Sequence, residues 1–175
     1  MMGWVMRKPA RYRILFVCMA NICRSPIAEA VARALAQRQG LAAMCEFDSA
    51  GTHGHSHAGE APDPRARRLA ARRGYDLSRM RARPVIDADF DRFDRLLAMD
   101  QANLSGLQRQ CPAEKQARLG LFLDYAEGLG LAEIPDPYYG ADSGFERVLD
   151  LCELAANGLL AACARGDLSR QEKPR

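Results

Sequence analysis

The sequence predicts an α/β fold in which a four-stranded parallel sheet is doubly wound, with helices on both faces. Two observations predict it. Short apolar runs rich in β-branched and aromatic residues alternate with longer segments whose apolar residues recur at helical spacing. The first such run, Tyr12–Cys18, ends in a continuous apolar stretch, which is typical of a strand buried on both faces. Ligands of such sheets bind beyond the carboxyl ends of the strands, so we expect a site directly after Cys18.

A helix is expected almost immediately after this first strand. Ser25 is the candidate N-cap, and Pro26 is placed as a first-turn proline. Gly40 can end the helix. The apolar residues that recur at helical spacing in between are Ile27, Ala30, Val31, Ala34 and Leu35.

The rest of the chain continues the alternation of strands and helices. A second strand at 45–50 ends in a Gly-rich loop at 51–59, and a helix at 62–73 is closed by Gly74. After an Arg-rich loop, the predicted elements are a short segment at 89–93, a strand at 95–99, a helix at 101–110, a strand at 117–123, a loop at 128–144 and a final helix from Phe145 to about Ala164. Right-handed crossovers between these strands would place helices on both faces of the sheet.

Length and composition predict one domain. The 175 residues, with 48% apolar and 27% charged side chains, fit a single domain at 11–166 between a flexible N-terminal extension at 1–10 and a flexible C-terminal tail at 167–175. Transmembrane and signal-peptide patterns are lacking, so we expect a cytoplasmic protein with no membrane insertion. A net charge of +3 is too small to indicate nucleic acid as a partner.

The six cysteines are expected to be thiols, because a chain of this size does not need disulfides to hold its core. No C-x-x-C pair occurs, which argues against a structural zinc site. Two of the cysteines fall on the apolar stripe of the final helix and are expected in the core. The six are Cys18, Cys23, Cys45, Cys111, Cys152 and Cys163.

The segment from Cys18 to Pro26 places a thiol, five residues, an arginine and a hydroxyl between a strand and a helix N-terminus. A helix N-terminus offers unpaired amides to an anion of phosphate size and also stabilises a thiolate. Arg24 can bind two phosphoryl oxygens as a fork, and Ser25 can donate to sulfur. The alternative is a buried strand cysteine and a surface arginine. C-x5-R alone is a weak pattern, but the whole run in this context is specific.

Two segments resemble the low-molecular-weight protein tyrosine phosphatase family. The run from Val17 to Glu29 is similar to the family's phosphate-binding signature, and the run from Asp136 to Gly140 is similar to its general-acid loop. The resemblance covers roughly residues 11–165 and includes 48–52 and 63–65. It implies a flavodoxin-like fold of the phosphotyrosine phosphatase I type.

The resemblance also implies roles for individual residues. Cys18 would form a phosphocysteine, Arg24 would hold the phosphoryl group, and Asp136 would protonate the leaving phenolate and then activate water. No metal or cofactor is implied; the substrate would be a tyrosine-phosphorylated protein, with a tyrosine kinase as a further partner. The residues expected to bind phosphate or substrate are Met19, Ala20, Asn21, Ile22, Cys23, Ser25, Tyr138 and Tyr139.

Without the resemblance, the general acid has four candidates: Asp48, Asp63, Asp100 and Asp136. Asp136 lies between two prolines, which stiffen the backbone and favour a preorganised proton donor. The ordinary role of an aspartate before proline is in a turn. The neighbouring tyrosines, 138 and 139, either wall the pocket and stack on an aromatic substrate or pack in the interior.

The sequence departs from the family pattern at three places. Ala20 stands where glycine is usual, which predicts a modest loss of activity. Met80 stands where many relatives have a histidine that supports the loop asparagine, so Asn21 is expected to be less firmly held. The loop at 52–60 lacks a large aromatic and offers a polar rim that would gain charge at low pH, with a metal site as the weaker alternative. Its polar residues are His53, His55, Ser56 and His57.

Other readings stay open at this point. An arsenate reductase on the same scaffold needs further cysteines to relay electrons, and a phosphoarginine phosphatase would be expected to have a polar residue at Ile22. A catalytically idle phosphopeptide binder needs only the loop and Arg24. Cys23 can act as a redox guard by forming a disulfide with Cys18. Eight arginines between residues 65 and 83 are interpreted mostly as a solvated surface.

Overall fold

The computed structural model describes residues 12–168 of the chain. The predicted extension at 1–10 lies outside the described residues, as do residues 169–175 of the predicted tail. Leu168 is 1% exposed and belongs to the core, so the packed chain continues past the predicted domain end at 166. None of the helices in the described range is long and apolar enough to cross a membrane.

The sheet confirms the predicted fold class. It has four parallel strands in the order β2-β1-β3-β4, so β1 lies in its interior. The chain passes from β1 to β2 on one side and then returns to β3 on the other side of β1. The switch point is therefore between β1 and β3, where ligands of such sheets bind. The strands are β1 (Tyr12–Cys18), β2 (Cys45–Gly51), β3 (Arg95–Ala98) and β4 (Leu119–Leu121).

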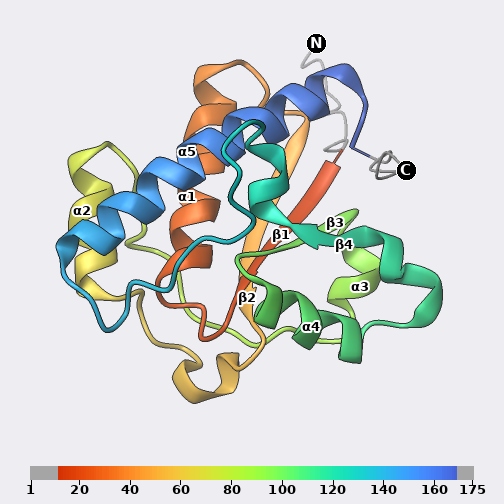
Figure 1. Ribbon diagram of the computed structural model, residues 1–175, viewed down its shortest axis with the longest axis horizontal. Coiled ribbons are helices and arrows are strands. Elements are labelled where there is room, and N and C mark those ends of the chain that lie inside the picture. Colours follow the sequence, from red (N-terminus) through yellow and green to blue (C-terminus); the bar gives the residue numbers. More distant parts are fainter. Residues whose placement is uncertain (1–11, 169–175) are drawn as a thin grey trace, which may run out of the picture.

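Helices cover both faces of this sheet (Figure 1). Residues of α1, α2 and α5 pack into one apolar cluster, and residues of α3 and α4 into the other. The helices are α1 (Arg24–Arg38), α2 (Pro64–Arg72), α3 (Asp89–Arg92), α4 (Gln101–Gln110) and α5 (Asp142–Arg165). Three 3-10 segments complete the fold, η1 (Gly54–His57), η2 (Ala113–Arg118) and η3 (Phe122–Tyr125).

Strand β1 contributes to both apolar clusters, as its continuous apolar run predicts. Ile14 and Phe16 belong to the cluster beneath α1 and α5, whereas Leu15 and Val17 belong to the cluster beneath α3 and α4. All four side chains are fully buried. Because side chains alternate between the two faces of a strand, this burial fixes the register of β1 and therefore the position of Cys18 at its end.

The beginning of α1 differs from the prediction. The helix begins at Arg24, the N-cap position is Cys23, and no side chain caps it, so the prediction that Ser25 is the N-cap is wrong. Ser25 is instead inside the first turn and fully buried. Pro26 does lie in the first turn, where its missing N–H leaves no helical hydrogen bond unmade.

The fourth strand and the last helix also differ from the prediction. Only three residues of the predicted strand 117–123 pair with β3, and the flanking residues form 3-10 turns. The carbonyl of Ala117 accepts from the side chain of Arg95 instead of a strand partner, and Phe122 turns inward to pack against Phe16. Helix α5 begins at Asp142, three residues before the predicted Phe145, where an acidic side chain suits the first turn.

Five of the eight arginines between 65 and 83 are exposed, which confirms that most of them form a solvated surface. The other three are half-buried and pair with carboxylates elsewhere in the fold or at their own helix start. These three are Arg65, Arg73 and Arg83.

Candidate active site

The loop from Cys18 to Cys23 joins β1 to α1 at the switch point of the sheet. Its carbonyl groups are held by amides from elsewhere: Thr52 donates to Cys18, His53 to Met19 and Asp63 to Ile22, at 2.7–2.9 Å. With these carbonyls engaged, the amides of the loop and of the first turn of α1 are available to an anion. These hydrogen bonds hold the loop in place against β2 and the start of α2.

The loop requires a glycine at position 51, and this requirement was not predicted from the sequence. A Cβ at this position would lie 2.5 Å from the carbonyl oxygen of Met19, a separation that side chains do not tolerate. The end of β2 can therefore approach the loop only without a side chain. The signal in the sequence was a glycine directly after a predicted strand, which also fits an ordinary turn.

Asn21 has a backbone φ of 60° and is the one described non-glycine residue with positive φ. Asparagine tolerates the left-handed region better than most residues. Its side-chain amide donates to Ser25 Oγ at 2.8 Å and to Ser49 Oγ at 3.0 Å, and its Oδ1 accepts from the amide of Arg83 at 3.0 Å. These three partners fix the amide of Asn21, while the expectation that Met80 leaves Asn21 less firmly held than a histidine would stays a prediction.

Ala20 does not adopt this left-handed conformation, so its Cβ causes no backbone strain. The modest loss of activity expected at this position stays a prediction.

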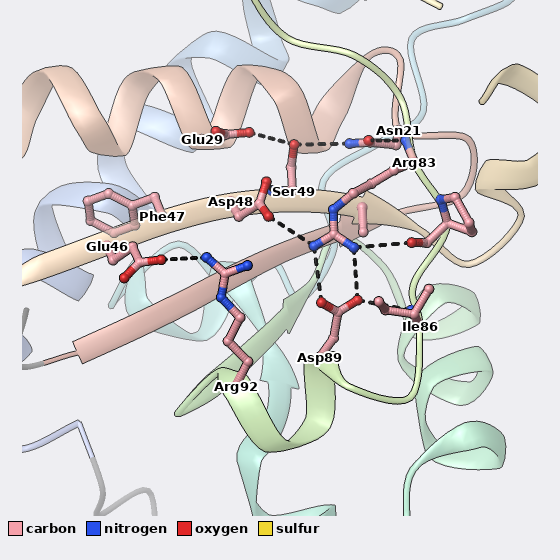
Figure 2. Close-up of polar contacts among 12 residues, drawn as sticks. Asn21, Glu29, Glu46, Phe47, Asp48, Ser49, Arg83, Ile86, Asp89 and Arg92 are labelled. Carbon is pink, nitrogen blue, oxygen red and sulfur yellow. Dashed lines mark hydrogen bonds and ion pairs between the residues drawn. The ribbon is translucent and has the colours of Figure 1, made fainter. Parts of the chain in front are cut away.

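The contacts behind Asn21 form a continuous polar network (Figure 2). Ser49 on β2 donates to Glu29 on α1 at 2.6 Å, and Glu29 also accepts from Arg33 at 2.7 Å. Glu29 is 6% exposed, and burial raises its pKa while Ser49 and Arg33 oppose that shift. The contact between Ser49 and Glu29 was not predicted from the sequence, because nothing local links residues twenty positions apart.

Arg83 anchors the other side of the same network. Its guanidinium lies between the carboxylates of Asp48, at 2.9 Å, and Asp89, at 3.0 and 3.1 Å (Figure 2). Although burial opposes the charge, these two carboxylates raise the pKa of Arg83. Since the backbone amide of the same residue holds Asn21, β2 and α3 together fix the position of the loop.

Cys18 and Ser25 lie together at the base of the loop. The Sγ atom of Cys18 is 3.0 Å from Ser25 Oγ, and both side chains are buried. Ser25 Oγ accepts from Asn21, and its own proton can go to sulfur or to the carbonyl oxygen of Ala50, 3.4 Å away. A hydroxyl that donates in this way stabilises a thiolate.

Arg24 is 3% exposed, which contradicts the alternative of a surface arginine. Its Nη1 contacts Asp100 Oδ2 at 2.6 Å and the carbonyl oxygen of Ile134 at 3.0 Å, and its Nη2 is 3.7 Å from Asp136 Oδ2. Burial works against the charge, but Cys18 and Asp100 raise the pKa of Arg24. A planar cation held in one orientation at the loop matches the oxygens of a bound phosphoryl group.

The structure distinguishes the four candidate acids. Asp48 pairs with Arg83, Asp63 caps α2 and pairs with Arg65, and Asp100 caps α4 and pairs with Arg24. Asp136 has a side chain that is 43% exposed and lines the same pocket as Cys18. Its Oδ1 accepts from the amide of Tyr138 at 3.1 Å, as in an Asx turn. Asp136 is therefore the carboxyl that faces the cavity.

The cavity above the loop has a volume of about 160 Å³. Tyr138 and Tyr139 are 39% and 95% exposed, and their rings meet edge to face, so the interpretation as interior residues is wrong. Of the predicted site residues, all but Asn21 and Ser25 line the cavity. The lining residues are Cys18, Met19, Ala20, Ile22, Cys23, Arg24, His57, Asp136, Tyr138 and Tyr139.

Of the three histidines, His57 lines the cavity. Its Nδ1 is 2.8 Å from Glu60 Oε2, and His53 Nδ1 is 3.1 Å from Thr52 Oγ1. Within residues 12–168, no group of three His, Cys, Asp or Glu side chains is arranged to hold a metal ion. The loop therefore contributes one histidine to the wall of the cavity.

All six cysteines are free thiols, as predicted. Cys152 and Cys163 are fully buried in the core, which confirms the prediction for the final helix. Cys111 belongs to the apolar cluster on the opposite face of the sheet. Cys23 is 4% exposed, and burial, followed by the charge of Asp63, raises its pKa.

The fold and the site place a cysteine and an arginine together at the switch point of a parallel α/β sheet, where ligands of such sheets bind. A family model described as low molecular weight phosphotyrosine protein phosphatase matches residues 13–171. The chain belongs to this family of hydrolases.

Relatives and solved structures agree with this assignment. The low molecular weight protein-tyrosine-phosphatase of Streptomyces coelicolor is 46% identical over 154 residues, covering 86% of this chain and 93% of that protein. The human low molecular weight phosphotyrosine protein phosphatase is 42% identical over 149 residues, covering 84% and 92%. A protein tyrosine phosphatase structure from Entamoeba histolytica, with Hepes in its active site, superposes with a TM-score of 0.85 at 39% identity, covering 89% and 98%. The structure of YfkJ from Bacillus subtilis gives 0.84 at 37%, covering 91% and 98%.

Proposed function

We propose that the protein hydrolyses phosphotyrosine in proteins through a phosphocysteine intermediate, without a metal or other cofactor. The observation that carries the proposal is the convergence of Cys18, Arg24 and Asp136 on one small cavity. A nucleophile, a phosphoryl-binding cation and a proton donor are the groups that such a reaction needs. The family and its named relatives support the same substrate class.

In the first step the thiolate of Cys18 attacks phosphorus, and a sulfur–phosphorus bond forms as the bond to the phenolic oxygen breaks. Asp136 gives its proton to that oxygen, so tyrosine leaves neutral. In the second step Asp136, now ionised, takes a proton from water, whose oxygen attacks phosphorus and releases the thiolate. Arg24 holds the phosphoryl oxygens in both steps, and the Ser25 hydroxyl stabilises the leaving sulfur.

The walls of the cavity favour an aromatic phosphate ester. Tyr138 and Met19 are partly exposed apolar side chains at the cavity, where they can contact a substrate ring. Ile22 lines the cavity as an apolar residue and offers no hydrogen bond to a phosphorylated guanidine. An apolar wall at this position disfavours phosphoarginine as the substrate.

The cysteines beyond the loop do not favour an arsenate reductase. Cys111 lies in the apolar cluster beneath α3 and α4, and Cys152 and Cys163 lie in the core. Electron relay by thiol exchange requires sulfur atoms that can reach one another. Cys23 is the remaining cysteine that shares the cavity with Cys18.

The test is phosphate release in the presence of a metal chelator, for wild type and for Cys18→Ser and Asp136→Ala. We expect no turnover in Cys18→Ser and a loss of roughly a hundredfold or more in Asp136→Ala. Cys111→Ser, distant from the site, is the matched cysteine control and should keep full activity. Full activity in Cys18→Ser would refute the mechanism, and an inactive wild type that binds phosphate would favour the binding domain. Phosphotyrosine, phosphoserine and phosphoarginine peptides compared in this assay identify the substrate class.

Cys23 is proposed as a redox guard of the same site. Peroxide would convert Cys18 to a sulfenic acid, and the thiol of Cys23 would attack that sulfur to form a disulfide, its proton passing to the departing hydroxyl, which leaves as water. A reducing thiol would then restore both thiols. If Cys23→Ser recovers from peroxide as fully as wild type, Cys23 has no such role.

All six cysteines are unpaired, which fits a reducing compartment. We therefore place the reaction in the cytoplasm, where it would reverse the action of a tyrosine kinase.

A further inference from the structure

Arg65 in the first turn of α2 reaches the loop that carries Asp136. Its Nη2 donates to the carbonyl oxygen of Tyr138 at 2.8 Å, and its Nη1 donates to that of Gly140 at 3.1 Å. The guanidinium also lies over the rings of Tyr138 and Phe145, with 5.8 and 4.6 Å between its carbon and the ring centroids. One side chain therefore holds the turn that follows Asp136.

The same guanidinium is fixed from behind by Asp63. Nε contacts Oδ1 at 3.1 Å and Nη2 contacts Oδ2 at 2.9 Å, a two-point fork. Burial alone would raise the pKa of Asp63, but its hydrogen bonds with Arg65 outweigh that effect and lower it. The backbone amide of Asp63 donates to the carbonyl of Ile22 in the phosphate loop. A continuous path of hydrogen bonds thus joins the phosphate loop to the acid loop.

The two sides of Asp136 are anchored differently. Before it, Ile134 is fully buried, its amide donates to Met99 and its carbonyl accepts from Arg24. After it, both hydrogen bonds that join residues 138–140 to another element of the described structure come from Arg65. Asp136 itself is partly exposed and 3.7 Å from Arg24. Its position over the phosphate loop therefore depends on Arg65.

We propose that Arg65 is a positioning residue for the proton transfer by Asp136. The inference rests on the proposed function, because it requires that Asp136 protonates the leaving oxygen. Arg65 touches no reacting atom and acts through the carbonyls that it holds. A displaced carboxyl delivers its proton less effectively, and the loss is greatest for a leaving group that most needs protonation.

The experiment measures kcat/KM for a series of aryl phosphates whose phenols differ in basicity. For Arg65→Met we expect a loss of about tenfold with the most basic phenol and little loss with the most acidic one. Asp136→Asn should change in the same direction and by more. Arg65→Lys keeps the charge but not the fork and should fall between wild type and Arg65→Met. Arg67→Met is the matched control, because Arg67 is exposed on the same helix.

A double variant separates positioning from a structural effect. In an Asp136→Asn background, Arg65→Met should not steepen the dependence on phenol basicity any further. Asp63→Asn keeps the cap of α2 but weakens the fork that holds Arg65. It should therefore reproduce the effect of Arg65→Met in smaller measure. If Arg65→Met does not fold, Asp63→Asn replaces it in the experiment. Inorganic phosphate should bind the folded variants as it binds wild type.

A loss that is equal for all phenols, or a further steepening in the Asp136→Asn background, would overturn the role of Arg65. Failure of the proposed function looks different. There, wild type itself is inactive, or Asp136→Asn keeps the wild-type dependence on phenol basicity.

Discussion

Beneath Cys18, which residue donates each hydrogen bond follows from whether its partner can only accept. Glu29 can only accept when ionised, so Ser49 donates to it and accepts from Asn21. Asn21 also donates to Ser25, whose hydroxyl proton is left for the sulfur of Cys18 at 3.0 Å or the carbonyl oxygen of Ala50 at 3.4 Å. A buried carboxylate twenty residues from Ser49 thus sets the polarity of the whole network.

Asn21 combines a left-handed backbone with a side chain that holds the loop, and two substitutions separate these roles. Asn21→Gly accepts the positive φ but loses the side chain, whereas Asn21→Ala loses both. We expect the free energy of unfolding of Asn21→Ala to be about 1 kcal/mol below that of Asn21→Gly, and both to lose activity. Urea denaturation measures the difference. Equal stability of the two variants would show that the backbone at Asn21 relaxes at no cost.

Glu29 predicts a pH dependence of stability. Burial raises the pKa of Glu29 in the folded state. The stability that this shift contributes is fully present below the unfolded pKa of about 4.3, and it is lost as pH rises through the folded pKa. Glu29→Gln lacks this titration. The free energy of unfolding of Glu29→Gln minus that of wild type should therefore increase from pH 4 toward neutral pH. Urea unfolding across this range checks it, with exposed Glu127→Gln as control. A difference that stays constant or decreases would show that the pKa of Glu29 is not raised by folding.

At the scale of elements, the end of β2 and the phosphate loop fit together only because Gly51 has no side chain. Gly51→Ala places a Cβ 2.5 Å from the Met19 carbonyl oxygen, so either the strand or the loop must move. We expect a loss of stability of about 1–3 kcal/mol and a weaker affinity for inorganic phosphate. Thermal unfolding and phosphate titration measure the two effects. An unchanged phosphate affinity would mean that the loop does not depend on this contact.

Elements defined by local pattern could be predicted from the sequence. Strand β1 and helix α4 have the predicted bounds, because a buried run and a helical repeat are local signals. Strand β4 could not be delimited, since Arg95 and the burial of Phe122 end its pairing and both are contacts across the fold. The predicted start of α1 was displaced because the side chain of the buried Ser25 contacts Cys18 instead of capping the helix.

At the scale of the whole molecule, the fold gathers groups that are far apart in the sequence. The loop from Cys18 to Arg24 was recognisable because its chemistry is contiguous. Asp100, 76 residues from Arg24, and Arg65, 73 residues from Tyr138, were not assigned their roles, because only the topology brings them to the switch point. The sequence therefore predicted the residues proposed to react, which the structure brings to one cavity, and not the residues that hold them in place.

The central claim is that the phosphoryl group passes through Cys18. The most direct measurement mixes the wild-type enzyme with excess aryl phosphate, quenches in acid within a turnover and maps the phosphorylated peptide by mass spectrometry. If the phosphoryl group passes through Cys18, one phosphoryl group is found on Cys18, is lost on longer incubation as inorganic phosphate forms, and is absent in Cys18→Ser. Phosphate release with no phosphoryl group on Cys18 at any time, or undiminished release from Cys18→Ser, would contradict it.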